Sequence, residues 1–145
     1  MKLYHGSKNG NLTTIKKMQA QAGDGVDVPE DELKDGIYLT PYYEFALACA
    51  VRPNGVTHIK DEEKTIEFEN PEGFFPEKDV YVYEVEVPEG VARQFDKNQL
   101  VIENMDEIAP TAKHQHKAGD IEQYYELINW KKEAKNETAA EFKIK

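Results

Sequence analysis

Hydrophobic and polar residues alternate most clearly in the segment VYVYEVEV at 80–87. Val80, Val82 and Glu84 fall on one side of an extended chain, and the tyrosines and remaining valines fall on the other. A period of two residues predicts a β-strand. The sequence Pro-Glu-Gly follows directly and predicts where this strand ends.

Shorter apolar runs predict further strands at 2–5, 36–40 and 99–103. Weaker strand patterns lie within 56–70, on either side of an acidic turn, and within 107–113. Most of these segments are bounded by Gly, Pro, Asn or Asp, which favour turns.

Two segments carry helical patterns. Residues 45–51 are apolar on most sides, which predicts a helix packed beneath a sheet, with Thr40 as N-cap and Pro41 in the first turn. A second helix is expected at 121–134, where apolar residues recur at helical spacing. Its apolar face consists of Ile121, Tyr124, Tyr125, Leu127, Ile128 and Trp130. Many strands and few helices predict an α+β fold.

The chain has 145 residues, which predicts one domain at 1–135 and a C-terminal tail at 136–145. Its net charge of −10 argues against an extended nucleic-acid surface, but one pyrophosphate can still be held in a pocket. Cys49 is the only cysteine, so an internal disulfide and a cysteine-based metal site are excluded. No apolar run approaches the roughly 18 residues of a membrane span, and no signal-peptide pattern is present, so we expect a cytoplasmic protein.

Two short motifs carry the candidate chemistry. The segment LYHGS at 3–7 places His5, Gly6 and Ser7 at the end of a strand, and the segment GIYLT at 36–40 places Tyr38 on a strand that leads into the helix. Together they resemble the NAD-binding half of the ADP-ribosyltransferase superfamily, which includes diphtheria-type toxins and the poly(ADP-ribose) polymerases. Residues 45–50 contain no second tyrosine, so the resemblance is to the compact bacterial or phage type.

The resemblance implies a split β-sheet with an NAD cleft between its halves, in which NAD is the substrate. His5 is expected to bond a ribose hydroxyl, and Gly6, beside Ser7, is expected to offer its backbone to the nicotinamide carboxamide. Tyr38 is expected to stack on the nicotinamide ring, so His5 and Tyr38 should line one cleft.

The resemblance also implies a glutamate near the start of a late strand, and this chain has Gln99 at that position. Glutamine can bond a ribose hydroxyl but carries no charge to stabilise an oxocarbenium ion. Glu103 is the nearest carboxylate and lies on the same strand face by alternation, and Glu84 is a further option. Gln99 and Glu103 are therefore the candidate catalytic residues.

The activity that the resemblance implies is transfer of ADP-ribose from NAD to a macromolecular target, with a protein favoured over a nucleic acid, and with release of nicotinamide. Small proteins of this type act as toxins, host-directed effectors or phage proteins. The polar segment 19–34 is a candidate lid over NAD or contact surface for the target.

Three alternatives remain open. Gln99 in place of a glutamate favours a catalytically inactive domain of the same fold that acts as a protein-interaction module. The motifs can also occur by chance in an unrelated α+β domain. An RNA 2′-phosphotransferase is disfavoured because the chain has only two arginines, Arg52 and Arg93.

His114 and His116 face the same way on an extended chain, as metal ligands can. A metal site needs three or four ligands, and further ligands near these two histidines are scattered. We therefore expect a surface loop here and no metal.

Overall fold

The computed structural model describes residues 1–17, 36–53 and 56–128 of the chain. Within these ranges the fold is mostly β-sheet with few helices, which confirms the expected α+β class at this coarse level. In chain order the elements are β1 (Lys2–Ser7), β2 (Ile15–Lys16), β3 (Ile37–Leu39), α1 (Tyr43–Val51), β4 (Thr57–Lys60), β5 (Thr65–Phe68), η2 (Pro71–Gly73), β6 (Asp79–Glu86), β7 (Arg93–Gln94), β8 (Leu100–Ile102), β9 (Glu107–Ile108), β10 (Ala112–Lys117), η3 (Ala118–Gln123) and β11 (Glu126–Leu127). The predicted segment 19–34 and the tail 136–145 lie outside the described residues.

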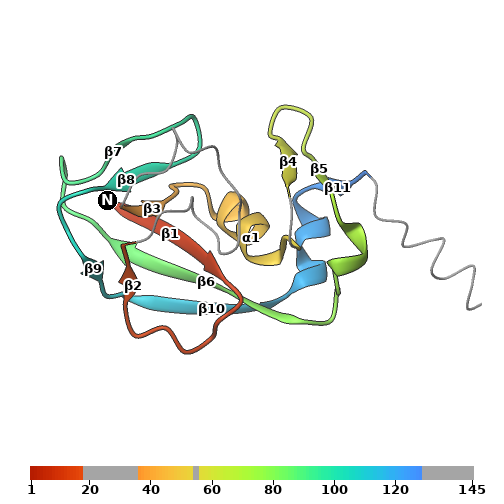
Figure 1. The fold of residues 1–145 in the computed structure, drawn as a ribbon, viewed down its shortest axis with the longest axis horizontal. Helices are drawn as coiled ribbons and strands as arrows, with labels where there is room; N and C mark the ends of the chain where they lie inside the picture. The colour runs from red at the N-terminus through yellow and green to blue at the C-terminus, as the bar shows by residue number, and fades with distance from the viewer. Residues whose placement is uncertain (18–35, 54–55, 129–145) are drawn as a thin grey trace, which may run out of the picture.

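The central sheet is antiparallel, with β6 between β1 and β10 (Figure 1). Val82 and Tyr83 of β6 point to opposite faces and are 0% and 1% exposed, so both faces of this strand are covered. The strand predicted at 80–87 is therefore confirmed as the middle strand of the sheet.

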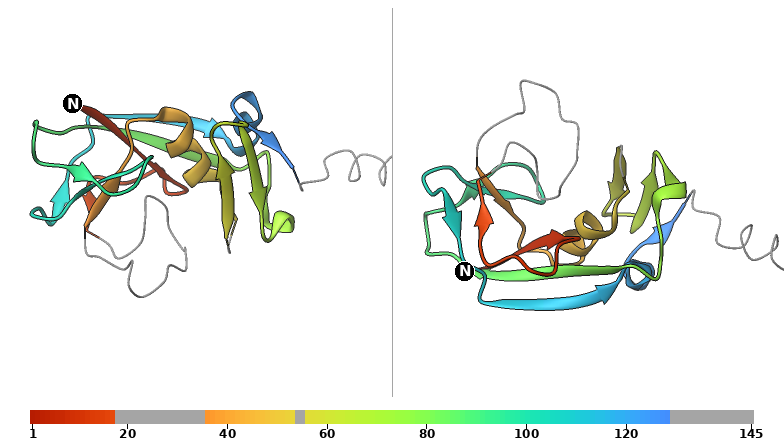
Figure 2. Two further views of the ribbon diagram at one scale, coloured as in Figure 1. Left: turned by 90° about the horizontal axis from the view of Figure 1, so that it is seen from above. Right: turned by 60° about the horizontal axis from the view of Figure 1, so that its bottom comes forward.

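A second sheet, with the order β3-β8-β7, is antiparallel, and a third, with the order β11-β5-β4, is mixed because β11 runs parallel to β5. Figures 1 and 2 show these two sheets at opposite ends of the molecule, with α1 between them. The central and second sheets touch where Tyr4 of β1 forms a bridge with Thr40, directly after β3.

Helix α1 covers one face of the central sheet, and the first core cluster lies beneath it. Its fully buried residues include Ala46, Leu47, Ala48, Val82, Phe68 and Ile121. The small alanine side chains allow α1 to lie close to the sheet, and Gly6 allows the closest contact, between α1 and β1. A Cβ at Gly6 would lie 1.9 Å from the carbonyl oxygen of Ala46 and 2.9 Å from the backbone nitrogen of Ala50. The contact between strand and helix therefore requires glycine at this position.

The second core cluster lies on the opposite face of β1. It joins β1, β3, β6 and β8 through Leu3, Ile15, Ile37, Leu39, Tyr83, Val85, Val87 and Ile102. Since Leu3 alternates with Tyr4 along β1, the two faces of one strand serve two separate clusters.

The helix that follows the Tyr38 strand begins later than predicted. Tyr42, not Thr40, is at the N-cap position and makes no side-chain capping bond. Thr40 instead accepts a hydrogen bond from the backbone N–H of Tyr42 at 3.1 Å, while its own backbone pairs with Tyr4. Because that pairing holds Thr40 in the sheet, the helix starts only at Tyr43.

The prediction of a helix across 121–134 is wrong for its described part. A short 3₁₀ helix, η3, ends at Gln123, and the chain then runs as β11 in parallel with β5. The N–H groups of Glu126 and Ile128 donate to carbonyls of β5 and its preceding residue, so sheet bonds replace helical ones. Residues 129–134 lie outside the described ranges.

Two smaller predictions have clear outcomes. His114 and His116 lie in β10, so the expected surface loop is a surface strand. Cys49 is buried, as expected for a residue of the apolar run 45–51, and burial raises the pKa of its thiol to about 11.

We expect Gly6→Ala to lower the free energy of unfolding by at least about 2 kcal/mol, because the new methyl group meets backbone atoms that cannot rotate away. Chemical denaturation of the purified protein measures this loss.

Gly119→Ala is the matched control, since its Cβ would meet Pro76 at the milder distance of 3.1 Å. We expect its loss to stay below about 1 kcal/mol. Equal losses in the two variants would show that α1 does not constrain position 6.

Candidate functional site

The seam between β1 and β3 is the structural feature that unites the two sequence motifs. The N–H of Tyr4 donates to the carbonyl of Thr40 at 2.8 Å, and the N–H of Thr40 donates back at 3.0 Å. Backbone groups of alternate strand residues point to the same edge, so Gly6 directs its N–H and C=O to this edge as well. Continuing the register would place Gly6 opposite Tyr38, but the two strands form no bridge there. Among the described residues, no backbone hydrogen bond to Gly6 occupies this edge.

His5 lies on the face of β1 that is turned away from α1 and is 3% exposed. It borders a cleft of about 480 Å³ between the end of β1 and β2. The other lining residues are Ser7, Asn9, Asn11, Leu12, Thr13, Thr14, Ile15, Lys16 and Lys17. Most of its lining residues have polar side chains, and the buried His5 is one of them.

The charge around this cleft differs from that of the whole chain. Residues 1–17 contain four lysines and no aspartate or glutamate, whereas the complete sequence has a net charge of −10. Lys16 and Lys17 form no ion pair with any carboxylate among the described residues. Two ammonium groups beside amide and hydroxyl side chains make a suitable environment for an anionic ligand.

The loop after β1 is held in a fixed shape by its own polar groups. The hydroxyl of Ser7 accepts from the N–H of Asn9 at 3.0 Å, and the side chain of Asn9 accepts from the N–H of Asn11 at 2.9 Å. The hydroxyl of Tyr83 donates to the carbonyl of Asn9 at 2.6 Å. The cleft wall is thus anchored to the central sheet.

Tyr38 lies on the other side of the seam from His5. Its ring is 2% exposed and packs with Phe45 and Cys49 of α1 and with Val101 of β8. Phe95 meets it edge to face, with ring centroids 5.0 Å apart. Since Tyr4 pairs with Thr40, strand alternation sends the side chains of Tyr38 and His5 to opposite faces, and Tyr38 does not line the cleft beside His5. The prediction that His5 and Tyr38 line one cleft is therefore wrong, because the pairing of Tyr4 with Thr40 sends their side chains to opposite faces.

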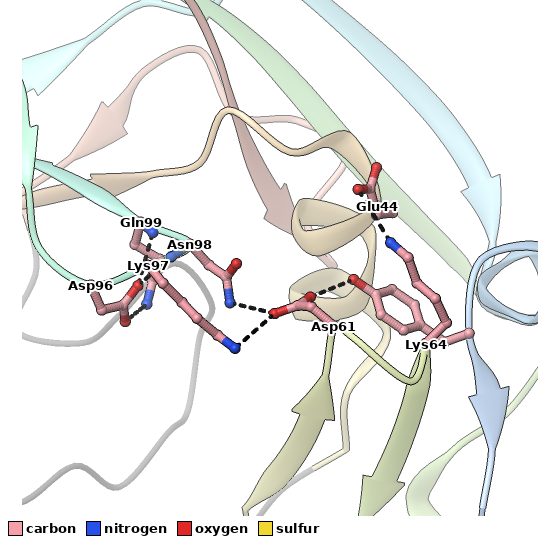
Figure 3. A network of polar contacts seen from close by, with 8 residues as sticks. Glu44, Asp61, Lys64, Asp96, Lys97, Asn98 and Gln99 are labelled. Carbon is pink, nitrogen blue, oxygen red and sulfur yellow. Dashed lines mark hydrogen bonds and ion pairs between the residues drawn. The ribbon is translucent and has the colours of Figure 1, made fainter.

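Gln99 is buried at the start of β8, with 2% of its surface exposed, and its side chain is tied to a carboxylate (Figure 3). Its Nε2 donates to Oδ2 of Asp96 at 2.9 Å. The other oxygen of Asp96 accepts from the backbone N–H groups of Asn98 and Gln99, both at 2.9 Å. Asp96 was not singled out from the sequence, although an aspartate side chain commonly accepts from the backbone N–H two residues on, as it does here from Asn98.

A second carboxylate, Asp61, fixes this loop to the opposite sheet. Asp61 lies in the turn between β4 and β5 and accepts from Nδ2 of Asn98 at 2.9 Å and from the hydroxyl of Tyr125 at 3.3 Å. Lys97 adds an ion pair at 3.7 Å. Figure 3 shows that these contacts bring the β4–β5 turn to the loop that carries Gln99.

The two other carboxylates that were considered have partners of their own. Glu103 is exposed and forms an ion pair with Arg93. Glu84 pairs with His114 at 2.5 Å and with Lys2 at 3.0 Å, and the hydrogen bond from His114, followed by that from Lys2, lowers the pKa of Glu84. The candidates for the catalytic position were thus Glu84, Glu103 and Gln99. Of these three, only Gln99 is both buried and adjacent to β8, the strand that pairs with β3.

The chain matches no known protein-family model, and no curated protein or solved structure is significantly similar to it. In the described part of the chain, no three His, Cys, Asp or Glu side chains are grouped to hold a metal ion. No helix in the same ranges is long and apolar enough to cross a membrane.

We expect Gln99→Glu to lower the free energy of unfolding at pH 7 by roughly 3 kcal/mol, equivalent to a pKa shift of about two units. The new carboxyl would face Asp96 at hydrogen-bond distance, so its pKa in the folded protein rises above the unfolded value. The loss is therefore full above the folded pKa and disappears below the unfolded one. Urea denaturation between pH 4 and pH 8 measures it.

Gln123→Glu provides the control, because Gln123 is exposed on η3. Its free energy of unfolding should change little across the same pH range. If Gln99→Glu behaved in the same way, the contact between Gln99 and Asp96 would not exist in solution.

Proposed function

We propose that the seam between β1 and β3 binds NAD, and that the protein transfers ADP-ribose to a macromolecular target with release of nicotinamide. The observation that carries this proposal is the edge of β1 at Gly6. Its N–H and C=O point to the place where β3 leaves β1. A carboxamide carries one acceptor and one donor group, so a backbone pair of this kind complements it.

The cleft beside His5 supports the same proposal for the rest of the ligand. His5 lies one residue from Gly6, so a ligand bonded to the Gly6 backbone has its adjoining ribose near the imidazole. Lys16 and Lys17 line the same cleft and supply charge for a pyrophosphate. A volume of about 480 Å³ is within the range of small-molecule sites.

Tyr38 lies on the strand that faces Gly6, but its side chain is on the face opposite to His5. Its ring is packed against Phe95, so stacking on nicotinamide would replace that edge-to-face contact. The ring would also have to leave its contacts with Phe45, Cys49 and Val101. In this proposal the ligand enters the seam between Tyr38 and the edge of β1.

For the chemical step, Gln99 is a better candidate than Glu103. Gln99 precedes the β8 strand that pairs with β3, whereas Glu103 is exposed and bonded to Arg93. Asp96 contributes negative charge within 2.9 Å of the Gln99 amide. The pair can orient a ribose hydroxyl and stabilise positive charge as the bond to nicotinamide breaks.

The second candidate is a binding module without catalysis, the alternative that the sequence left open. It is favoured by the saturation of the Asp96 carboxylate, which already accepts from two backbone N–H groups and from Gln99. A carboxylate engaged in this way is less available to a reacting ribose. Binding of NAD without release of nicotinamide would favour this candidate.

We expect NAD to bind the purified protein in calorimetry. The double variant Lys16→Gln, Lys17→Gln should bind NAD at least about tenfold more weakly. Each lost charge–phosphate contact is worth about 1 kcal/mol near a protein surface. Nicotinamide release is assayed in the same samples, so that binding and chemistry are measured separately.

Lys60→Gln, which removes one positive charge rather than two, is the control for loss of surface charge, because Lys60 lies in β4, outside the cleft. Equal weakening in both variants would place the ligand elsewhere. No binding at millimolar NAD would overturn the proposal.

A further inference from the structure

A hydrogen-bonded chain of Tyr43, His116 and Asp120 lies on the α1 side of the central sheet, and none of the three lines the cleft beside His5. The three residues come from α1, β10 and η3. The hydroxyl of Tyr43 lies 2.6 Å from Nε2 of His116, and Nδ1 of His116 lies 2.9 Å from a carboxylate oxygen of Asp120.

The partners of His116 define which nitrogen carries its proton. An ionised carboxylate only accepts, so Nδ1 of His116 donates to Asp120. In the neutral imidazole the lone pair of Nε2 then faces the Tyr43 hydroxyl, which donates to it. This is the order of nucleophile, base and orienting group that activates a hydroxyl for attack.

The surroundings keep this chain partly accessible. The side chains of His116 and Asp120 are 20% and 34% exposed. Tyr4 meets the Tyr43 ring edge to face, with centroids 5.2 Å apart, and fixes its orientation. Tyr124, which is 38% exposed, adds apolar surface nearby.

Burial, followed by the charges of Tyr124 and Glu84, raises the pKa of Tyr43 to about 12. The phenol is therefore neutral at pH 7, and its proton has to leave during the attack itself. His116 is positioned to take that proton.

We propose that Tyr43 accepts an acyl group from a neutral activated ester, with His116 as general base and Asp120 as positioning residue. The Tyr43 oxygen forms a bond to the ester carbonyl carbon, and the bond from that carbon to the leaving oxygen breaks. The proton moves from Tyr43 to Nε2 of His116 and then to the leaving group, which departs as an alcohol or phenol. Water, deprotonated by the same nitrogen, hydrolyses the tyrosine ester and restores the hydroxyl.

Local charge favours a neutral ester over an anionic phosphoryl donor. Glu84 and Asp120 both place negative charge near Tyr43, and both act to raise its pKa. Lys2 and His114 are already paired with Glu84. These negative charges would repel an incoming anion but not an uncharged carbonyl group.

The test uses p-nitrophenyl acetate with the full chain, without NAD, and locates acetyl groups by peptide mass spectrometry. Tyr42 is an internal control, since it is 46% exposed and adjoins Tyr43 in sequence. We expect Tyr43 to be acetylated at least tenfold faster than Tyr42, although Tyr42 is the more accessible. This ratio comes from the unmodified protein and does not depend on any variant folding.

Variants then test the role of each residue in the hydrogen-bonded chain. Tyr43→Phe should abolish the fast release of p-nitrophenol, and Tyr42→Phe should leave it unchanged. His116→Gln should reduce the Tyr43 rate to that of Tyr42 or below. Asp120→Asn keeps an acceptor for the Lys117 N–H and should slow the reaction, whereas Asp120→Glu should restore part of the rate.

Acetylation of Tyr42 at an equal or higher rate than Tyr43, or an unchanged rate in folded His116→Gln, would overturn the proposal. Since NAD is absent from the assay, its result is independent of the function proposed for the seam.

Discussion

Helix α1 approaches β1 so closely that the carbonyl of Ala46 occupies the space that a side chain at position 6 would need. This contact fixes the helix over the central sheet, and the rest of the structure follows from its position. The start of α1 then brings Tyr43 to the edge strand β10, where it meets His116. Further along, Phe45 and Cys49 close over Tyr38 and Val101. One helix therefore supports both regions for which we propose chemistry.

Position 6 also shows how one residue can satisfy two independent requirements. The missing side chain of Gly6 faces α1, while its N–H and C=O point sideways to the seam with β3. These directions are perpendicular in a β-strand, so the helix contact leaves the backbone edge unchanged. The sequence explanation, in which glycine allows a ligand to approach, is incomplete, because the close approach seen in the structure is that of a helix.

Local patterns predicted those parts of the fold that depend on local interactions. The alternation at 80–87 identified β6, and the apolar run at 45–51 identified α1, because each pattern matches the geometry of one element. The prediction of a helix at 121–134 failed because backbone pairing with β5, about sixty residues earlier in the chain, outweighs the helical spacing of Tyr124 and Leu127. No local pattern reports such a pairing.

The candidate site, too, could be predicted only in part from local sequence patterns. His5, Gly6 and Tyr38 were found as motifs, and the structure places them on two strands that touch at Tyr4 and Thr40. Their opposite faces were not foreseen, because they depend on which residues of the two strands pair. Asp96 was also missed, since its importance lies in the contact with the side chain of Gln99 rather than in any spacing.

Strand β10 is one of the two outer strands of the central sheet, and its sequence AKHQHK contains no large apolar residue. An outer strand offers backbone groups to any other extended chain, and proteins commonly protect it with lysine. Lys113 and Lys117 carry this charge here, and Lys117 is held by Asp79 of the neighbouring strand. These charges disfavour edge-to-edge association at the strand that carries His116.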